Sequence, residues 1–120
     1  MKQRITSDQL QQLTPSQQEK LRAWWKPEIG DKFDAERSGI TWLVASVNGE
    51  RIETHAGIFL KNECLPLLSI GQCLQILGEH NRYYELRNYE NNFHFYDQDN
   101  LKSKSPELID ALFEAVKSIL

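Results

Sequence analysis

The chain predicts an α+β fold in which an antiparallel sheet of four to five strands, built from two hairpins, carries its helices on one face. Two observations indicate this fold. Four segments have helix start signals and apolar residues at spacings of three and four. Between them lie β-branched and aromatic segments joined by turn residues. Helices and strands do not alternate strictly along the chain, which disfavours a doubly wound parallel sheet.

The length of 120 residues predicts one domain. We expect residues 1–30 to form an N-terminal helical layer, and residues 31–120 to form the sheet with two helices. The composition, 40% apolar and 26% charged, is typical of a soluble globular protein. No apolar run reaches the roughly 20 residues that span a membrane, and no apolar stretch follows the basic N-terminus, as a signal peptide requires. A cytoplasmic location without membrane association is expected.

The tryptophan-ended helix near the N-terminus has the clearest start signal. Thr14 and Gln17 form a Thr-x-x-Gln capping box, and Pro15 falls at the first helical position, where a missing N–H costs nothing. The next two turns are polar, and the helix ends on the adjacent pair Trp24 and Trp25. Apolar side chains are therefore confined to its C-terminal third, which predicts a helix anchored at one end.

Three further helices are expected. The first is a short turn at residues 7–11, capped by Ser7. Another begins at the N-cap Ser69 and stops at Gly78, with apolar residues on one face. The last begins at the N-cap Ser105, with a proline at its first position, and runs to the C-terminus as an amphipathic helix.

The first predicted hairpin lies between the second and third helices. Residues 40–47 are β-branched and aromatic, which favours a strand buried on both faces. Asn48 and Gly49 form a strong hairpin-turn signal, because both central turn positions favour a positive φ. Residues 51–56 form the return strand, and residues 32–34 are expected to add an edge strand.

The second predicted hairpin lies between the third and fourth helices. Residues 82–89 form its first strand, residues 90–92 its turn, and residues 93–96 its return strand. Because side chains alternate along a strand, Phe95 is expected on the inner face and His94 on the outward face.

The paired tryptophans suggest two interpretations. Adjacent helical residues point about 100° apart, so both rings cannot enter one pocket. The simpler interpretation is that both rings cover the margins of the core and hold the helix near Phe33. The other is that one ring stays exposed and marks a protein-binding surface, because tryptophan is frequent in interface hot spots. In this second case the partner-binding residues are Trp24 and Trp25 with Gln17 and Lys20 of the same helix.

No residue cluster indicates catalysis, a cofactor or a metal. The three histidines, His55, His80 and His94, are far apart in sequence, without a Cys-x-x-Cys or His-x-x-x-His pair. Cys64 has no basic neighbour in sequence that would favour its thiolate, and Cys64 and Cys73 are expected to be reduced and partly buried. We therefore predict that the protein is not an enzyme and needs no cofactor.

Nucleic-acid binding is disfavoured by the net charge of −3 and the pI of about 5.6. The second hairpin offers one alternative, an exposed stacking platform for single-stranded nucleic acid. The platform would consist of four aromatic residues: Tyr83, Tyr89, His94 and Tyr96. It is flanked by four acidic residues: Glu85, Glu90, Asp97 and Asp99. Acidic flanks repel phosphate, so cross-strand packing is the favoured role of these rings.

Three stretches of the chain carry a resemblance to a known group of proteins. They are residues 21–27 with the Gly30-Asp31 pair that follows, residues 64–72 and residues 108–117. Together they resemble small uncharacterised proteins of phages and prophages of Gram-positive bacteria. The resemblance implies a cytoplasmic accessory protein that acts on a host or phage partner. It brings no activity and no catalytic residues.

The leading hypothesis is a non-enzymatic protein-interaction module that modulates a host factor, with homo-oligomerisation as an open alternative. A second hypothesis is a small-ligand-binding domain whose pocket lies between the sheet and the third helix, near His55, Cys64 and Cys73. The third is single-stranded nucleic-acid binding by the aromatic hairpin.

Overall fold

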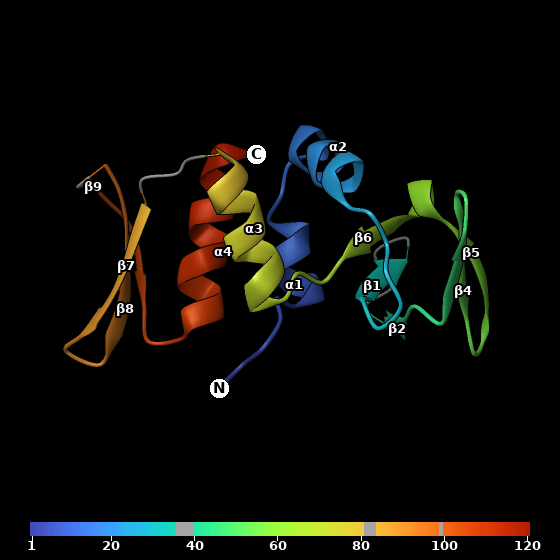
Figure 1. Ribbon diagram of the computed structural model, residues 1–120, viewed down its shortest axis with the longest axis horizontal. Helices are drawn as coiled ribbons and strands as arrows, with labels where there is room; N and C mark the ends of the chain where they lie inside the picture. The colour runs from blue at the N-terminus through green and yellow to red at the C-terminus, as the bar shows by residue number, and fades with distance from the viewer. Residues whose placement is uncertain (36–39, 81–83, 99) are drawn as a thin grey trace. The chain divides into compact units, whose positions relative to one another are not determined.

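The computed structural model describes residues 1–35, 40–80, 84–98 and 100–120. These residues form two compact units, both drawn in Figure 1. The N-terminal unit is Thr6–Leu67, and the C-terminal unit joins Met1–Ile5 to Leu68–Leu120. Within the described residues the fold is α+β, with four helices and three separate three-stranded antiparallel sheets. The prediction of one sheet of four to five strands is therefore wrong.

The longest predicted strand of the first hairpin is divided at Val44, and this division separates two sheets. The part before it forms β2 (Thr41–Leu43), and the part after it forms β3 (Ser46–Asn48). The backbone of Val44 bonds to the loop that precedes the first sheet instead. Its N–H donates to the carbonyl of Asp31 (2.9 Å), and its carbonyl accepts the N–H of Gly30 (3.0 Å).

Helices α1 (Ser7–Gln11) and α2 (Pro15–Trp24) open the N-terminal unit, and both begin with capping boxes. The predicted box of α2 is confirmed. The cap of α1 is Thr6 and not Ser7 as predicted, because the Thr6 hydroxyl accepts the Gln9 N–H (3.2 Å) while the Thr6 N–H donates to the Gln9 side chain (2.9 Å).

The first sheet has β1 (Lys32–Ala35) at its centre, between β2 and β6 (Cys64–Pro66). Phe33 lies opposite Trp42 of β2 on one side and Pro66 of β6 on the other. The prediction of an edge strand here is wrong. Strand β6, which the sequence pattern does not reveal, supplies the second neighbour.

In the second sheet β3 pairs with β4 (Arg51–Thr54), which pairs with β5 (Gly57–Leu60). The turn between β3 and β4 is centred one residue later than predicted, because Asn48 is the last residue of β3 and Gly49 has a φ of +60°. The Thr54 hydroxyl accepts two backbone N–H groups of the following turn, both at 3.1 Å. This turn ends the predicted return strand and leads into β5.

The core of the N-terminal unit is a chain of aromatic contacts across the two sheets and the end of α2. The ring centroids of Trp25 and Phe33 are 5.9 Å apart, and those of Phe33 and Phe59 are 5.6 Å apart. Trp42 continues the chain at 4.9 Å from Phe59. The expected clamp between the tryptophan pair and Phe33 is thus confirmed, and Trp25 provides it.

The C-terminal unit contains α3 (Ile70–His80), α4 (Leu108–Ile119) and a sheet of β7 (Tyr84–Tyr89), β8 (Asn92–Asp97) and β9 (Asn100–Ser105). Helix α4 packs against α3 and against β8 and β9 (Figure 1). It buries one apolar face: Ile109, Ala111, Leu112, Phe113, Ala115 and Val116. None of the described helices is long and apolar enough to cross a membrane.

Two helix boundaries in this unit differ from their predictions. The start of α3 is confirmed, because the Ser69 hydroxyl accepts the Gln72 N–H (3.1 Å) and the Ser69 N–H donates to the Gln72 side chain (2.9 Å). The helix continues past Gly78, which does not stop it. Helix α4 begins later than predicted, since the Ser105 hydroxyl accepts the Glu107 N–H (3.2 Å) in the turn before the helix.

The second hairpin is confirmed, but its turn is one residue shorter than predicted, because Asn92 is the first residue of β8. Glu90 and Asn91 have positive φ values of 53° and 61°, the geometry of a tight two-residue turn. The third strand, β9, is not predicted by the sequence pattern. Residues 82–83, the start of the predicted first strand, lie outside the described residues.

Candidate functional site

The structure places the four predicted partner-binding residues in different environments. Trp25 is fully buried, and its indole N–H donates to Asp31 (3.0 Å). It therefore belongs to the core, where a partner cannot reach it. Trp24 is half-buried against the same core, and Gln17 is occupied in the helix cap. Lys20 is exposed, so the surface that remains for a partner consists of Lys20 and the outer part of Trp24.

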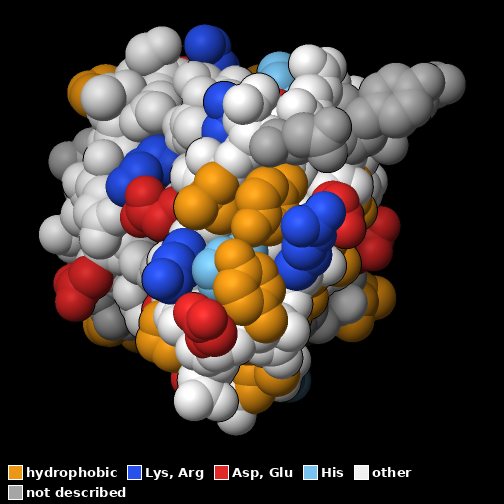
Figure 2. Space-filling model, turned by 90° about the vertical axis from the view of Figure 1, so that its left-hand side faces the viewer, with side chains coloured by type: hydrophobic (Ala, Val, Ile, Leu, Met, Phe, Trp, Pro, Cys, Tyr) orange, Lys and Arg blue, Asp and Glu red, His pale blue; other side chains and the backbone are white. Residues whose placement is uncertain are grey.

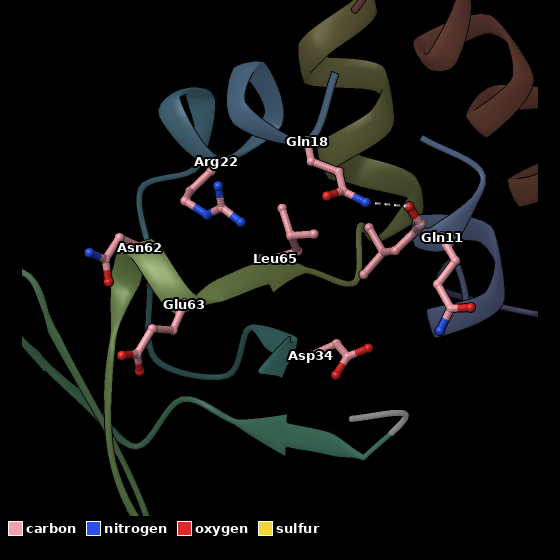
Figure 3. Close-up of a pocket in the computed structure, with 8 residues that line it drawn as sticks. Gln11, Gln18, Arg22, Asp34, Asn62, Glu63 and Leu65 are labelled. Carbon is pink, nitrogen blue, oxygen red and sulfur yellow. Dashed lines mark hydrogen bonds between the residues drawn. The ribbon is translucent and has the colours of Figure 1, made fainter. Parts of the chain in front are cut away.

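A cavity of about 400 Å³ lies within the N-terminal unit (Figure 3). Helices α1 and α2, strands β1 and β6, and the short 3₁₀ helix Lys61–Glu63 provide its walls. Eight residues line it: Leu10, Gln11, Gln18, Arg22, Asp34, Asn62, Glu63 and Leu65. The set combines two aliphatic side chains, charges of both signs and three amides.

Arg22 projects from α2 into this cavity (Figure 3). Its Nε donates to the carbonyl oxygen of Cys64 (3.1 Å), and one terminal nitrogen pairs with Glu19 on the same helix. The other terminal nitrogen has no hydrogen-bond partner among the described residues. Two nitrogens of the guanidinium are thus engaged, and the N–H donors of the third are available to a ligand.

Asp34 contributes a carboxylate from β1, and only 3% of this residue is exposed. It pairs across the sheet with Leu65 of β6, so both side chains lie on the face that the helices cover. Gln18 is also buried, and its amide donates to the carbonyls of Leu10 and Leu13, both at 3.4 Å. Polar groups therefore reach the cavity from a sheet and from a helix.

The predicted pocket near His55, Cys64 and Cys73 does not coincide with this cavity, which none of these three residues lines. Alternation along β6 gives the reason. Leu65 faces the cavity, so its neighbour Cys64 faces the core, where its thiol donates to the Leu60 carbonyl (3.3 Å). His55 is exposed, in the turn between β4 and β5.

Cys64 and Cys73 are buried as thiols, and neither forms a disulfide. Within the part of the chain that the structure describes, no three His, Cys, Asp or Glu side chains lie together as a metal site would require. Burial raises the pKa of Cys73 to about 12, so this thiol stays protonated near neutral pH.

The outer face of the β7–β8–β9 sheet forms a second surface of interest (Figure 2). The rings of Tyr89 and His94 stack with centroids 4.0 Å apart and planes 21° apart, and the ring of Tyr96 lies 6.4 Å from His94. His94 lies on the outward face, as predicted, but it is not exposed. The stacking of the rings leaves only 3% of this residue accessible to solvent. Tyr83 lies outside the described residues.

Comparison of the chain with models of protein families, with curated proteins and with solved structures finds no match. The sequence also gives no signal for the cavity. Its lining residues are scattered between positions 10 and 65, and no motif spacing connects them. Gln18 in particular lies in a polar helical turn, where no apolar pattern marks it as buried.

Proposed function

We propose that the N-terminal unit is a non-enzymatic binding domain for a small zwitterionic molecule, one that carries an amino group and a carboxylate. The observation behind this proposal is a cavity lined by charges of both signs, from Arg22 and from the carboxylates of Asp34 and Glu63. Its volume of about 400 Å³ lies in the range of roughly 300–1,000 Å³ that is usual for small-molecule sites.

The two charged groups suit the two ends of such a ligand. The planar guanidinium of Arg22 matches a carboxylate, and its bonds to Cys64 and Glu19 hold it in place before the ligand arrives. The carboxylate of Asp34 is shielded from water, which strengthens its attraction for an ammonium group. Leu10 and Leu65 offer an apolar surface to the carbon atoms between the two ends.

Thermal unfolding and calorimetry of the full chain test this proposal. The probes are the free amino acids, each compared with the analogue that lacks its amino group and the one that lacks its carboxylate. At a concentration one-hundred-fold above Kd, a ligand stabilises the folded state by about 2.7 kcal/mol, and Tm rises by several degrees. We expect both truncated analogues to bind more weakly than the zwitterion.

Two variants locate the binding to the cavity. Arg22→Gln is expected to weaken it at least tenfold, whereas the control Lys20→Gln, on the exposed side of the same helix, is not. Gln11→Trp, at an exposed position of α1 that lines the cavity, is expected to block it without removing a buried contact. The proposal is wrong if no zwitterion raises Tm, or if both cavity variants bind as tightly as the wild type.

We propose protein binding as a second function, at the edge strand β5. Ile58 is 61% exposed, and Leu60 is exposed on the same face of the strand. This four-residue edge contains no charge and no proline, the features that normally protect an edge from pairing with another chain. A partner that adds a strand there would suit the predicted role of an accessory protein acting on a host or phage factor.

The variant Ile58→Lys tests strand addition, because a charge on an edge strand opposes pairing. The control is Ile29→Lys, at an exposed loop position outside the sheets. Light scattering over a range of concentrations measures self-association, and affinity capture from host lysate measures other partners. We expect Ile58→Lys to lose the complex and Ile29→Lys to keep it. A complex that persists in the Ile58→Lys variant would show that β5 is not the binding site.

A further inference from the structure

Exposed and stacked rings occupy the outer face of the β7–β8–β9 sheet. Tyr89 is 46% exposed above His94, and Tyr96 is half-buried beside them. We infer that this face binds single-stranded nucleic acid, because unpaired bases stack on exposed aromatic rings with little dependence on sequence. This surface belongs to the C-terminal unit and is separate from the cavity.

Cationic side chains lie on both sides of His94, where a phosphate backbone would need them. The guanidinium of Arg87 lies 4.8 Å from the centre of the Tyr96 ring. Arg87 and Lys104 are the cross-strand neighbours of His94, one on each side of it. Lys102 and Lys104 are exposed on β9 and have no ion-pair partner among the described residues. Figure 2 shows Lys and Arg side chains on both sides of a histidine and its hydrophobic neighbours.

Of the four acidic residues that flank the rings in sequence, Glu85 and Asp97 repel a phosphate on this face less than the sequence suggests. Glu85 is neutralised by two hydrogen bonds from Arg87 (2.8 and 3.0 Å), and these bonds lower the pKa of the Glu85 carboxyl. Asp97 pairs with Tyr84, whose ring stacks on the buried Phe95, so Asp97 belongs to the opposite face. Lys104 thus lies next to His94 without an opposing carboxylate from Glu85, whereas the exposed Glu90 lies in the turn beside Tyr89.

His94 adds an observation that points to a ligand. Both of its ring nitrogens are buried, and neither has a hydrogen-bond partner among the described residues. Buried polar groups are normally hydrogen-bonded, so this imidazole is an exception. The hydroxyls of Tyr89 and Tyr96 lie within hydrogen-bond distance of each other (3.4 Å) beside this imidazole. A base that displaced this contact would meet the imidazole and supply the missing partner, in the way that loop bases are read by hydrogen bonds.

Fluorescence anisotropy of the full chain with labelled oligothymidylate and oligouridylate tests the inference. Between about 50 and 200 mM salt, the logarithm of the binding constant should fall linearly with the logarithm of the salt concentration, with a slope of about −0.7 for each phosphate contacted, so about −1.4 for contacts from Lys102 and Lys104. Tyr89→Leu should weaken binding by about tenfold, and Tyr89→Phe should retain it. Lys104→Gln should reduce the slope by about 0.7, and the control Lys20→Gln, in the other unit, should not.

Three results would overturn the inference. The first is no binding at the lowest salt concentration. The second is equal affinity for the oligonucleotides and for inorganic polyphosphate, which indicates attraction of any polyanion. The third is an unchanged affinity in a Tyr89→Leu variant whose circular dichroism matches that of the wild type. If Tyr89→Leu does not fold, the salt slopes of Lys104→Gln and Lys20→Gln are compared instead. Equal slopes for these two variants would then overturn the inference.

Discussion

The indole N–H of Trp25 donates a hydrogen bond to the carboxylate of Asp31 at 3.0 Å, across the loop that follows α2. The same oxygen of Asp31 accepts the backbone N–H of Glu28 at 3.1 Å. Trp25 is fully buried, with its ring against Phe33. The end of α2 is therefore held to the sheet by a polar contact as well as by apolar packing.

Loss of this hydrogen bond should destabilise the N-terminal unit. Asp31→Ala leaves the buried indole N–H of Trp25 without its acceptor, and we expect the free energy of unfolding to fall by about 1–3 kcal/mol in urea denaturation. The control is the same substitution in a Trp25→Phe background, where no indole N–H is present. Its cost should be smaller there, and an equal cost in both backgrounds would show that the Trp25–Asp31 bond contributes nothing.

The turn between β3 and β4 can be located by substitution. Gly49 has a φ of +60°, and Asn48 does not have a positive φ. Gly49→Ala should therefore lower the free energy of unfolding by about 1–2 kcal/mol, since a side chain is strained in the left-handed region. Asn48→Ala should change it by less than about 0.5 kcal/mol. Thermal and urea unfolding measure both variants, and a comparable cost for Asn48→Ala and Gly49→Ala would place the turn at Asn48 and Gly49.

Cys73 should make the stability depend on alkaline pH. Burial raises the pKa of its thiol to about 12, whereas an unfolded cysteine has a pKa of about 8.5. Below about pH 8.5 both states keep the proton, and the contribution to stability is complete. As the pH rises further the unfolded state loses the proton first, so the free energy of unfolding falls until the folded thiol ionises near pH 12.

Urea unfolding between about pH 8 and pH 10.5 measures this effect, with Cys73→Ala as the control. The wild type should lose stability relative to the variant by on the order of 2 kcal/mol over that interval. Parallel curves for the two proteins would mean that the thiol is not buried in solution.

His94→Phe should stabilise the C-terminal unit. The substitution keeps a flat ring of similar size between Tyr89 and Tyr96, and it removes two buried nitrogens that have no partner among the described residues. We expect the free energy of unfolding to rise by about 1 kcal/mol. His55→Phe, at an exposed position, serves as the control and should bring no gain. A destabilised His94→Phe protein would show that the imidazole nitrogens are hydrogen-bonded in solution.

Features that depend on neighbouring residues could be predicted from the sequence. The capping boxes at Thr14 and Ser69 each join residues three positions apart, and the structure has both. The turn at Glu90 and Asn91 is also local. The division at Val44 could not be predicted, because its backbone partners lie in a loop 13 and 14 residues earlier. Without that division, residues 40–47 follow the pattern of one long strand.

The sequence by itself determined the α+β class, the starts of α2 and α3 and the turn of the second hairpin. It determined them because hydrogen bonds between residues a few positions apart fix these features. Only the tertiary structure decided the division into three sheets, the burial of Trp25 rather than Trp24, and the enclosure of Arg22 and Asp34 in one cavity. These depend on strand pairing and packing between residues distant in sequence, and a pattern of single residues does not specify which distant segments meet.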